Sequence, residues 1–95
     1  MNETVRVLLV DDHPLVRVAL ASVIAAIPGL TVCGEADSAS SAIEMYRSLR
    51  PDLVLMDLRL RDGSGAQAIA AIREESPDAR IVVISSLMAS VRRSR

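Results

Sequence analysis

The sequence contains no lysine, phenylalanine or tryptophan, and its only aromatic residue is Tyr46. All 11 basic residues are therefore arginines, and 12 acidic residues leave a formal net charge of −1. A general nucleic-acid-binding protein is usually basic and carries aromatic side chains that stack on bases, so this composition argues against that class. The absence of lysine also excludes Schiff-base chemistry and a lysine clamp on phosphate within these residues.

Cysteine is represented by Cys33 alone, so a disulfide framework is excluded and we expect a small buried apolar residue. The longest stretch without charge runs from Val18 to Gly34, where Pro28-Gly29 interrupts it. It is too short for a membrane-spanning helix, which needs about 20 apolar residues. The acidic beginning, Met1 to Thr4, does not resemble a secretion signal. We therefore expect a cytoplasmic protein that does not enter a membrane.

Apolar residues make up 51% of the 95 residues, which predicts one small domain with its own core. Short runs rich in β-branched residues alternate with segments of helical periodicity. The predicted strands are 5–10, 30–36, 53–56 and 81–84, and helices are predicted to begin near 14, 38, 66 and 87. Strands that alternate with helices of this length predict an α/β fold, a doubly wound parallel sheet with right-handed crossovers.

The first predicted helix begins at Pro14 and ends at Pro28-Gly29. Four apolar residues recur along it at helical spacing, and we predict that they form its buried face. These residues are Val16, Leu20, Val23 and Ile27. The second helix begins at Ser38 or one turn later at Ser41, because both residues have the spacing of a helix cap.

The composition of the strands predicts their places in the sheet. The first, third and fourth are continuous apolar runs, as interior strands of such sheets are, whereas polar residues interrupt the second. In the order 2-1-3-4 the fourth strand, 81–84, would nevertheless lie at an edge. We therefore expect something to lie beside it that this chain does not supply, because an apolar edge invites pairing with another chain.

Three of the predicted strands end in oxygen-bearing side chains. Asp11 and Asp12 follow the first strand, Asp57 follows the third, and Ser85 follows the fourth. Ligands of open α/β sheets bind outside the carboxyl ends of the strands, so the three acids should converge on one crevice. Neighbouring carboxylates repel one another unless a cation or proton intervenes, and a cluster of oxygens suits Mg²⁺. One carboxylate would then be free to act as a nucleophile toward phosphorus.

Four stretches of the sequence resemble those of a known family. They are Val7-Leu8-Leu9-Val10-Asp11-Asp12-His13-Pro14, Pro51-Asp52-Leu53-Val54-Leu55-Met56-Asp57, Asp62-Gly63-Ser64-Gly65 and Ile81-Val82-Val83-Ile84-Ser85. Over residues 5–95 the sequence resembles the receiver (CheY-like) domain of two-component response regulators. Its Asp-Asp-His-Pro and Ile-Pro-Gly-Leu stretches are most similar to the subfamily with LuxR-type helix-turn-helix outputs. The resemblance implies a flavodoxin-like sheet of order 2-1-3-4-5, of which this chain would hold 2-1-3-4 and lack the fifth β-α unit.

The resemblance also implies a role for each site residue. Asp57 would accept the phosphoryl group, and Asp11 and Asp12 would hold Mg²⁺ (or Mn²⁺), Asp12 more directly. Asp57 and the backbone carbonyl of Arg59 would add further metal ligands. The Ser85 hydroxyl would hydrogen-bond the phosphoryl group and report its presence. A sensor histidine kinase would be the phosphoryl donor, and DNA would be contacted only through an output domain absent from this chain.

In the family, a lysine at the end of the fifth strand pairs with the phosphoryl group. Residues 1–95 would form one receiver domain that stops before this strand, and no other lysine replaces the missing one. We therefore expect a phosphorylated signalling module and not a turnover enzyme, with phosphoryl acceptance impaired by the missing lysine.

Two other functions stay open. The chain would act mainly as a structural unit if it self-associated through residues 81–84, as an edge-paired or domain-swapped homodimer or larger oligomer. It would be a metal-dependent phosphatase if Asp57 turned over phosphate esters, although no general acid or base is evident outside the acid cluster. His13 follows the acid pair directly, and we expect it to cap the helix or to lie exposed.

Overall fold

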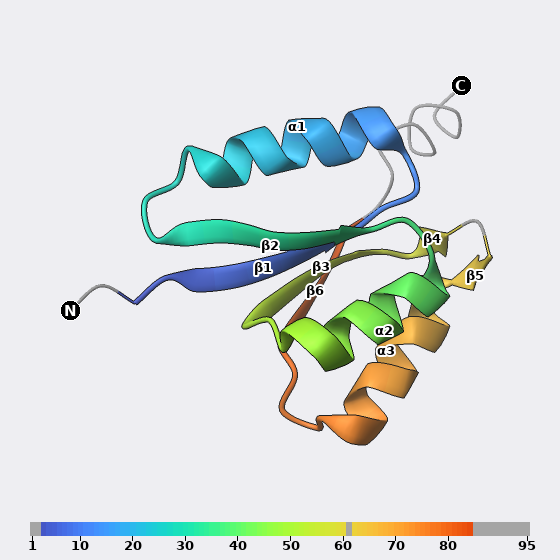
Figure 1. The fold of residues 1–95 in the computed structure, drawn as a ribbon. Coiled ribbons are helices and arrows are strands. Elements are labelled where there is room, and N and C mark those ends of the chain that lie inside the picture. Colours follow the sequence, from blue (N-terminus) through green and yellow to red (C-terminus); the bar gives the residue numbers. More distant parts are fainter. Residues whose placement is uncertain (1–2, 61, 85–95) are drawn as a thin grey trace.

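The structure, a computed structural model, describes residues 3–60 and 62–84 (Figure 1). Four parallel strands and three helices alternate along the chain, and a short hairpin interrupts the alternation after the third strand. The strands are β1 (Val5–Val10), β2 (Leu30–Ala36), β3 (Leu53–Asp57) and β6 (Ile81–Ile84). The helices are α1 (Pro14–Ala25), α2 (Ala39–Leu49) and α3 (Gly65–Glu75), and the hairpin consists of β4 (Arg59–Leu60) and β5 (Gly63–Ser64).

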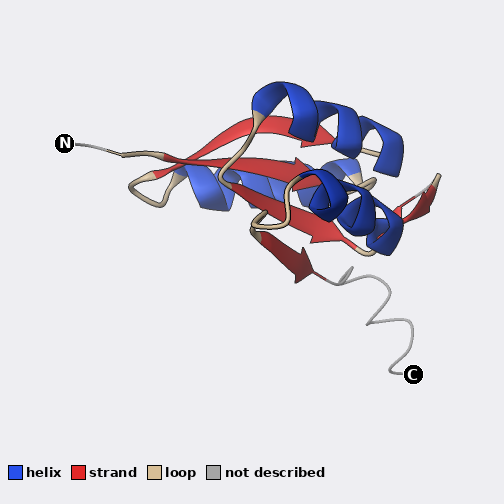
Figure 2. Cartoon of the chain, turned by 90° about the horizontal axis from the view of Figure 1, so that it is seen from below, coloured by secondary structure: helices blue, strands red, loops and turns tan. Residues whose placement is uncertain are grey.

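The main sheet has the order β2-β1-β3-β6, which confirms the predicted order 2-1-3-4. The β1–β3 and β3–β6 pairings are in regular parallel register, with Val10 opposite Met56 and Met56 opposite Val83. Helix α1 covers one face of the sheet, whereas α2 and α3 cover the other (Figures 1 and 2). The fold is therefore the doubly wound α/β arrangement that the sequence predicted.

The core lies on both faces of β1 and β3, because successive side chains of a strand point to opposite sides. Val7 and Leu9 pack with Ile24 under α1, whereas Leu8 and Val10 pack in the larger cluster under α2 and α3. These four side chains of β1 are at most 1% exposed. The acidic residue that follows β1 is therefore held by a strand whose last four residues are buried.

The predicted buried face of α1 is wrong at two of its four positions. Val23 is 58% exposed and Ile27 is 43% exposed, whereas Ile24 is 5% exposed. The residues of α1 that pack on the sheet are Leu20, Ala21 and Ile24. Ile24 lies four residues after Leu20, on the same face of the helix, whereas Val23 lies at the edge of that face. Ile27 lies after the end of the helix.

Helix α2 begins at the first of the two predicted caps. The Ser38 side chain accepts a hydrogen bond from the backbone N–H of Ser41, and the Ser41 side chain accepts one from the N–H of Ser38. At the other end Arg50 adopts a left-handed conformation (φ 48°), and Pro51 follows. The Arg6 guanidinium donates to the carbonyls of Leu49 and Arg50, so β1 also holds this helix end.

Within the described residues β6 is the outer strand of the sheet, and Val82 and Val83 are 47% and 46% exposed. This agrees with the expectation of an apolar strand placed at an edge. Ser85 and the helix predicted from residue 87 lie outside the described residues. Among the helices that the structure describes, none is both long and apolar enough to cross a bilayer.

Candidate functional site

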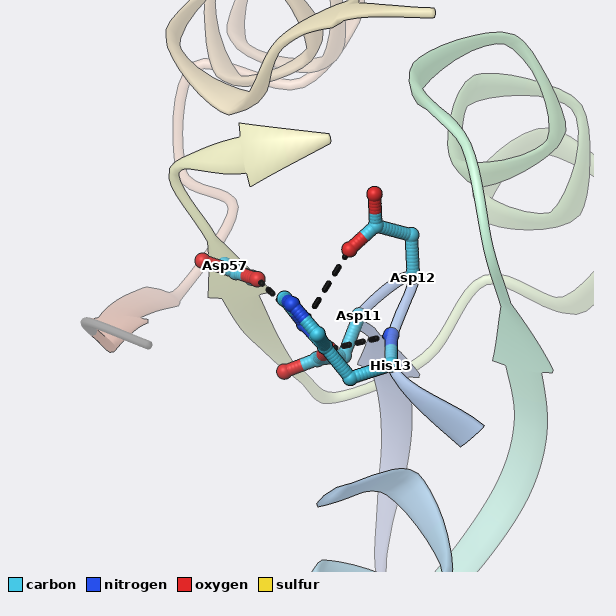
Figure 3. Close-up of side chains that lie close together, drawn as sticks. All are labelled: Asp11, Asp12, His13 and Asp57. Carbon is cyan, nitrogen blue, oxygen red and sulfur yellow. Dashed lines mark hydrogen bonds and ion pairs between the residues drawn. The ribbon is translucent and has the colours of Figure 1, made fainter. Parts of the chain in front are cut away.

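An acidic cluster forms where β1 and β3 end side by side (Figure 3). Asp57 is the last residue of β3, and Asp11 directly follows β1, in which Val10 is paired with Met56. Asp11 is 1% exposed and Asp57 is 0% exposed, so both carboxyl groups are buried at the carboxyl end of the sheet. Asp12 lies in the loop before α1 and completes the three acids that the sequence predicted to converge.

The hydrogen bonds of the cluster leave two carboxylate oxygens without a partner. Oδ1 of Asp57 accepts a hydrogen bond of 3.1 Å from the backbone N–H of Arg59. Oδ1 of Asp11 accepts one of 2.7 Å from the N–H of His13. Oδ2 of Asp57 and Oδ1 of Asp12 are buried and have no hydrogen-bond partner among residues 3–60 and 62–84. A buried anionic oxygen of this kind is costly unless a proton or cation compensates it.

Burial raises the pKa of the Asp57 carboxyl above its ordinary value. The hydrogen bond from the Arg59 N–H acts in the opposite direction, and the negative charge of Asp11 adds to the upward shift. The apolar strand and the neighbouring acid thus both disfavour the charged form of Asp57. A divalent cation in the crevice would reduce this penalty, because its positive charge would favour the ionised form of the carboxylates.

The sequence predicted that His13 caps α1 or lies exposed; its side chain is 40% exposed, but it also contacts the acidic cluster, which was not predicted. Its backbone occupies the cap position, but its side chain makes no capping hydrogen bond. Nδ1 lies 2.9 Å from Oδ1 of Asp11 and 3.1 Å from Oδ1 of Asp12. The hydrogen bond to Asp11 raises the pKa of the His13 imidazole.

The donor set fits a divalent cation. One atom from each of Asp11, Asp12, His13 and Asp57 lies within 4.8 Å of all the others, a spacing at which one ion can contact all four. Two of these residues, Asp12 and Asp57, carry the buried oxygens that have no hydrogen-bond partner within the described part of the chain. Carboxylate oxygens are the ligands that Mg²⁺ and Mn²⁺ prefer.

The backbone around Asp57 is held in place by close packing of the loop and α3. Gly65 begins α3, and its N–H donates a hydrogen bond of 2.8 Å to the carbonyl of Leu58. A β-carbon at Gly65 would overlap the Asp57 carbonyl oxygen and would lie 2.8 Å from the Cα of Leu58. Only glycine allows this approach of the helix to the strand end.

The segment after Asp57 is also tied to α2. The Asp62 carboxylate accepts hydrogen bonds from the backbone N–H groups of Ala39 (2.7 Å) and Ser40 (3.3 Å) at the start of that helix. These bonds lower the pKa of the Asp62 carboxyl. Hydrogen bonds therefore connect the loop that follows the acidic site to the N-terminus of α2.

The structure brings together Asp11, Asp12 and Asp57, and it places Arg59 in β4, two residues after Asp57. Sequence reasoning did not assign His13 to the cluster. The position of His13 directly after two acids could have indicated a place in the cluster, but the same position is equally compatible with a helix cap. The place of Asp62 was not foreseen either, because its partners are 22 and 23 residues away in the sequence.

The parallel sheet with buried acids at its carboxyl end defines a doubly wound α/β protein of the flavodoxin-like type. The family model of the response regulator receiver domain matches residues 7–93, and the chain belongs to this family.

Three relatives illustrate the similarity. The nitrate/nitrite response regulator protein NarL of Escherichia coli (strain K12) is 41% identical over 84 residues, which are 88% of this chain and 39% of NarL. A LuxR-family response regulator from Aurantimonas sp. SI85-9A1 is 41% identical in its crystal structure, with a TM-score of 0.84, covering 87% of this chain and 59% of that one. The CheX–CheY complex with BeF₃ and Mg²⁺ from Borrelia burgdorferi is 25% identical, with a TM-score of 0.81 and coverages of 86% and 62%. The chain thus spans about two fifths of the length of the curated relative.

Proposed function

We propose that this chain is the phosphoryl-accepting module of a two-component response regulator and that Asp57 is the acceptor. The observation that carries the proposal is the place of Asp57. Its side chain is 0% exposed, Oδ2 has no hydrogen-bond partner among the residues that the structure describes, and Asp11 and Asp12 lie beside it. Such a carboxylate needs a cation, and with one it becomes a nucleophile next to bound positive charge.

Asp11, Asp12, Asp57 and the backbone carbonyl of Arg59 would hold Mg²⁺ (or Mn²⁺). The buried partnerless oxygens support this assignment, and the related CheX–CheY structure contains Mg²⁺ and BeF₃. The bound ion would neutralise charge on the transferring phosphoryl group.

An Asp57 oxygen would form a bond to phosphorus while the bond from phosphorus to an imidazole nitrogen of a sensor histidine kinase breaks. The Ser85 hydroxyl would then hydrogen-bond the phosphoryl group and report its presence. Within residues 1–95 no lysine is present to pair with that group. We therefore expect this single domain to accept the phosphoryl group weakly.

The relatives support a wider role in transcription regulation, because NarL is a nitrate/nitrite response regulator and the Aurantimonas protein is of the LuxR family. In this proposal the domain is a cytoplasmic signalling module and not a turnover enzyme. Contact with DNA would require an output domain outside these 95 residues.

The test is incubation with a small acyl phosphate, or with BeF₃⁻, in the presence and absence of Mg²⁺. We expect a Mg²⁺-dependent adduct, seen as added phosphoryl mass or a fluorine NMR signal, that maps to Asp57. The variant Asp57→Asn should lose it. The control Asp52→Asn should keep it, because Asp52 lies at the opposite end of β3 and bonds the N–H of Arg6. An adduct that survives in Asp57→Asn, or that forms without metal, would contradict the proposal.

A second candidate function is self-association along β6. Val82 and Val83 are about half exposed although they belong to a continuous apolar strand, and β6 is the outer strand among the described residues. A second copy that added its own strand, or exchanged one, would bury these side chains and give a homodimer or larger oligomer.

Sedimentation of the wild-type chain and of Val83→Arg measures this directly. A charge on an edge strand opposes pairing, so the variant should shift the equilibrium toward monomer. Asp78→Arg, which places the same charge in the exposed turn before β6, is the matched control. A wild-type chain that stays monomeric at high concentration would refute self-association.

A further inference from the structure

The imidazole of His13 occupies the centre of the acidic cluster. Figure 3 shows the ring between the carboxyl groups of Asp12 and Asp57, with Asp11 below it. Nδ1 lies 2.9 Å from Oδ1 of Asp11, 3.1 Å from Oδ1 of Asp12 and 3.8 Å from Oδ2 of Asp57. The last two oxygens are the buried atoms that lack a hydrogen-bond partner. The nitrogen and the partnerless oxygens therefore face the same small volume.

Two of these three separations match those of adjacent ligands around one ion. Adjacent ligands of an octahedral ion with bonds of ~2.1 Å lie about 3.0 Å apart. Two of the three separations from Nδ1 have this value, and the third lies between those of adjacent and opposite ligands. Of the three contacts, only the one with Asp11 is a hydrogen bond, so the approach of Asp12 and Asp57 to the same nitrogen has no hydrogen bond behind it.

We propose that His13 is a nitrogen ligand of the ion held by Asp11, Asp12 and Asp57, and that it shifts the site from Mg²⁺ toward transition metals such as Ni²⁺ and Co²⁺. Imidazole suits transition metals, whereas Mg²⁺ takes oxygen ligands. The proposal rests on the acids being metal ligands, as the proposed function requires. It adds a specificity-determining residue that lies on the loop between β1 and α1.

The local structure permits replacement of His13 without loss of the fold. Its side chain is 40% exposed and makes no capping hydrogen bond, and the bond from its backbone N–H to Asp11 does not depend on the side chain. The variants His13→Leu and His13→Gln should therefore fold, and each removes the imidazole.

The test is titration of the wild-type chain and both variants with Ni²⁺ and with Mg²⁺, followed by calorimetry. We expect each His13 variant to lose about tenfold or more in Ni²⁺ affinity, because metal sites lose about 10–100-fold even when a supporting partner of a ligand is removed. Mg²⁺ affinity should stay within about twofold, because Mg²⁺ does not depend on the nitrogen. Equal losses for the two metals, or no loss of Ni²⁺ affinity, would overturn the proposal.

A spectroscopic readout on the wild-type chain is independent of folding in the variants. His13 is the only histidine in the sequence, so imidazole coupling in the Cu²⁺ electron paramagnetic resonance spectrum must come from it. We expect this coupling in the wild type and its loss in both variants, and its absence from the wild type would refute ligation.

Asp57→Asn separates this proposal from the proposed function. If it weakens binding of both metals while the His13 variants weaken only Ni²⁺, both are supported. If Asp57→Asn leaves Mg²⁺ binding unchanged, the metal role of Asp57 fails, and the spectrum of the wild type still decides the role of His13.

Discussion

Gly65 touches the backbone of Asp57 so closely that no side chain fits between them. A β-carbon built at Gly65 would overlap the Asp57 carbonyl oxygen, whereas one built at Gly29 meets no atom within 4 Å. The first turn of α3 therefore fixes the backbone of the proposed phosphoryl acceptor.

We expect Gly65→Ala to lower the free energy of unfolding by about 1–3 kcal/mol, the usual cost of overpacking, and to abolish the Mg²⁺-dependent adduct. Urea unfolding and fluorine NMR measure the two effects. Gly29→Ala is the matched control. It costs about 1–2 kcal/mol because Gly29 has a φ of 90°, but it should retain the adduct. Normal adduct formation in Gly65→Ala would show that the close approach does not position Asp57.

Asp57→Asn should stabilise the metal-free protein at neutral pH, raising the midpoint of thermal unfolding by several degrees. The substitution removes a buried charge beside two other acids and keeps an oxygen that accepts from the Arg59 N–H. Mg²⁺ should raise the midpoint of the wild type and have a much smaller effect on the variant. Asp52→Asn, on an exposed carboxyl, should give no such stabilisation, and a lower midpoint for Asp57→Asn would contradict the argument.

The Asp62 carboxylate should stabilise the folded protein at neutral pH, and this contribution should be lost in acid. Hydrogen bonds from α2 lower the pKa of its carboxyl in the folded state, so the folded state binds fewer protons than the unfolded chain. Its stabilising contribution is present above the unfolded value of about 3.9 and is lost as the pH falls through the lower folded value. Urea unfolding between about pH 7 and pH 3 should show a shallower acid loss for Asp62→Asn than for the wild type. If the free energy of unfolding fell equally with pH in the wild type and in Asp62→Asn, the contribution of Asp62 would be excluded.

Among the arginines on the described helices, Arg17 should contribute most to the free energy of unfolding. Its guanidinium donates 2.7 Å to the carbonyl of Asp11 and 3.3 Å to the carboxylate of Glu35, and so it joins α1 to the ends of β1 and β2. Arg17→Met should lower the free energy of unfolding by about 1.5–3 kcal/mol. Arg47→Met, which breaks an exposed ion pair with Glu75, should have a much smaller effect. If denaturant unfolding gave equal losses of free energy for Arg17→Met and Arg47→Met, burial would not distinguish the contacts of Arg17 from those of Arg47.

The strands were predictable because a parallel sheet covered on both faces requires uninterrupted apolar runs. The predicted strands 5–10, 30–36 and 81–84 match β1, β2 and β6. The order of the strands in the sheet was predicted from the family resemblance. The convergence of Asp11 and Asp57 was predictable for the same reason, since both follow neighbouring parallel strands.

The rest depended on contacts between distant residues. The face of α1 was misjudged because an apolar residue stands at both Val23 and Ile24, and only packing against the sheet selects Ile24. The hairpin of β4 and β5 has two-residue strands, which are too short to produce a periodic pattern. The position of the His13 ring beside Asp57, which lies 44 positions further along the chain, follows only from the pairing of β1 with β3.

The hydrogen bonds between Asp62 and the start of α2 offer a way to follow the acidic site by hydrogen exchange. The amide protons of Ala39 and Ser40 are held by a carboxylate that lies five residues after Asp57. An event at Asp57 that moves this loop away from α2 would break those bonds. Hydrogen exchange at these two amides should then accelerate, which makes the start of α2 a place to follow the state of the acidic site without a label.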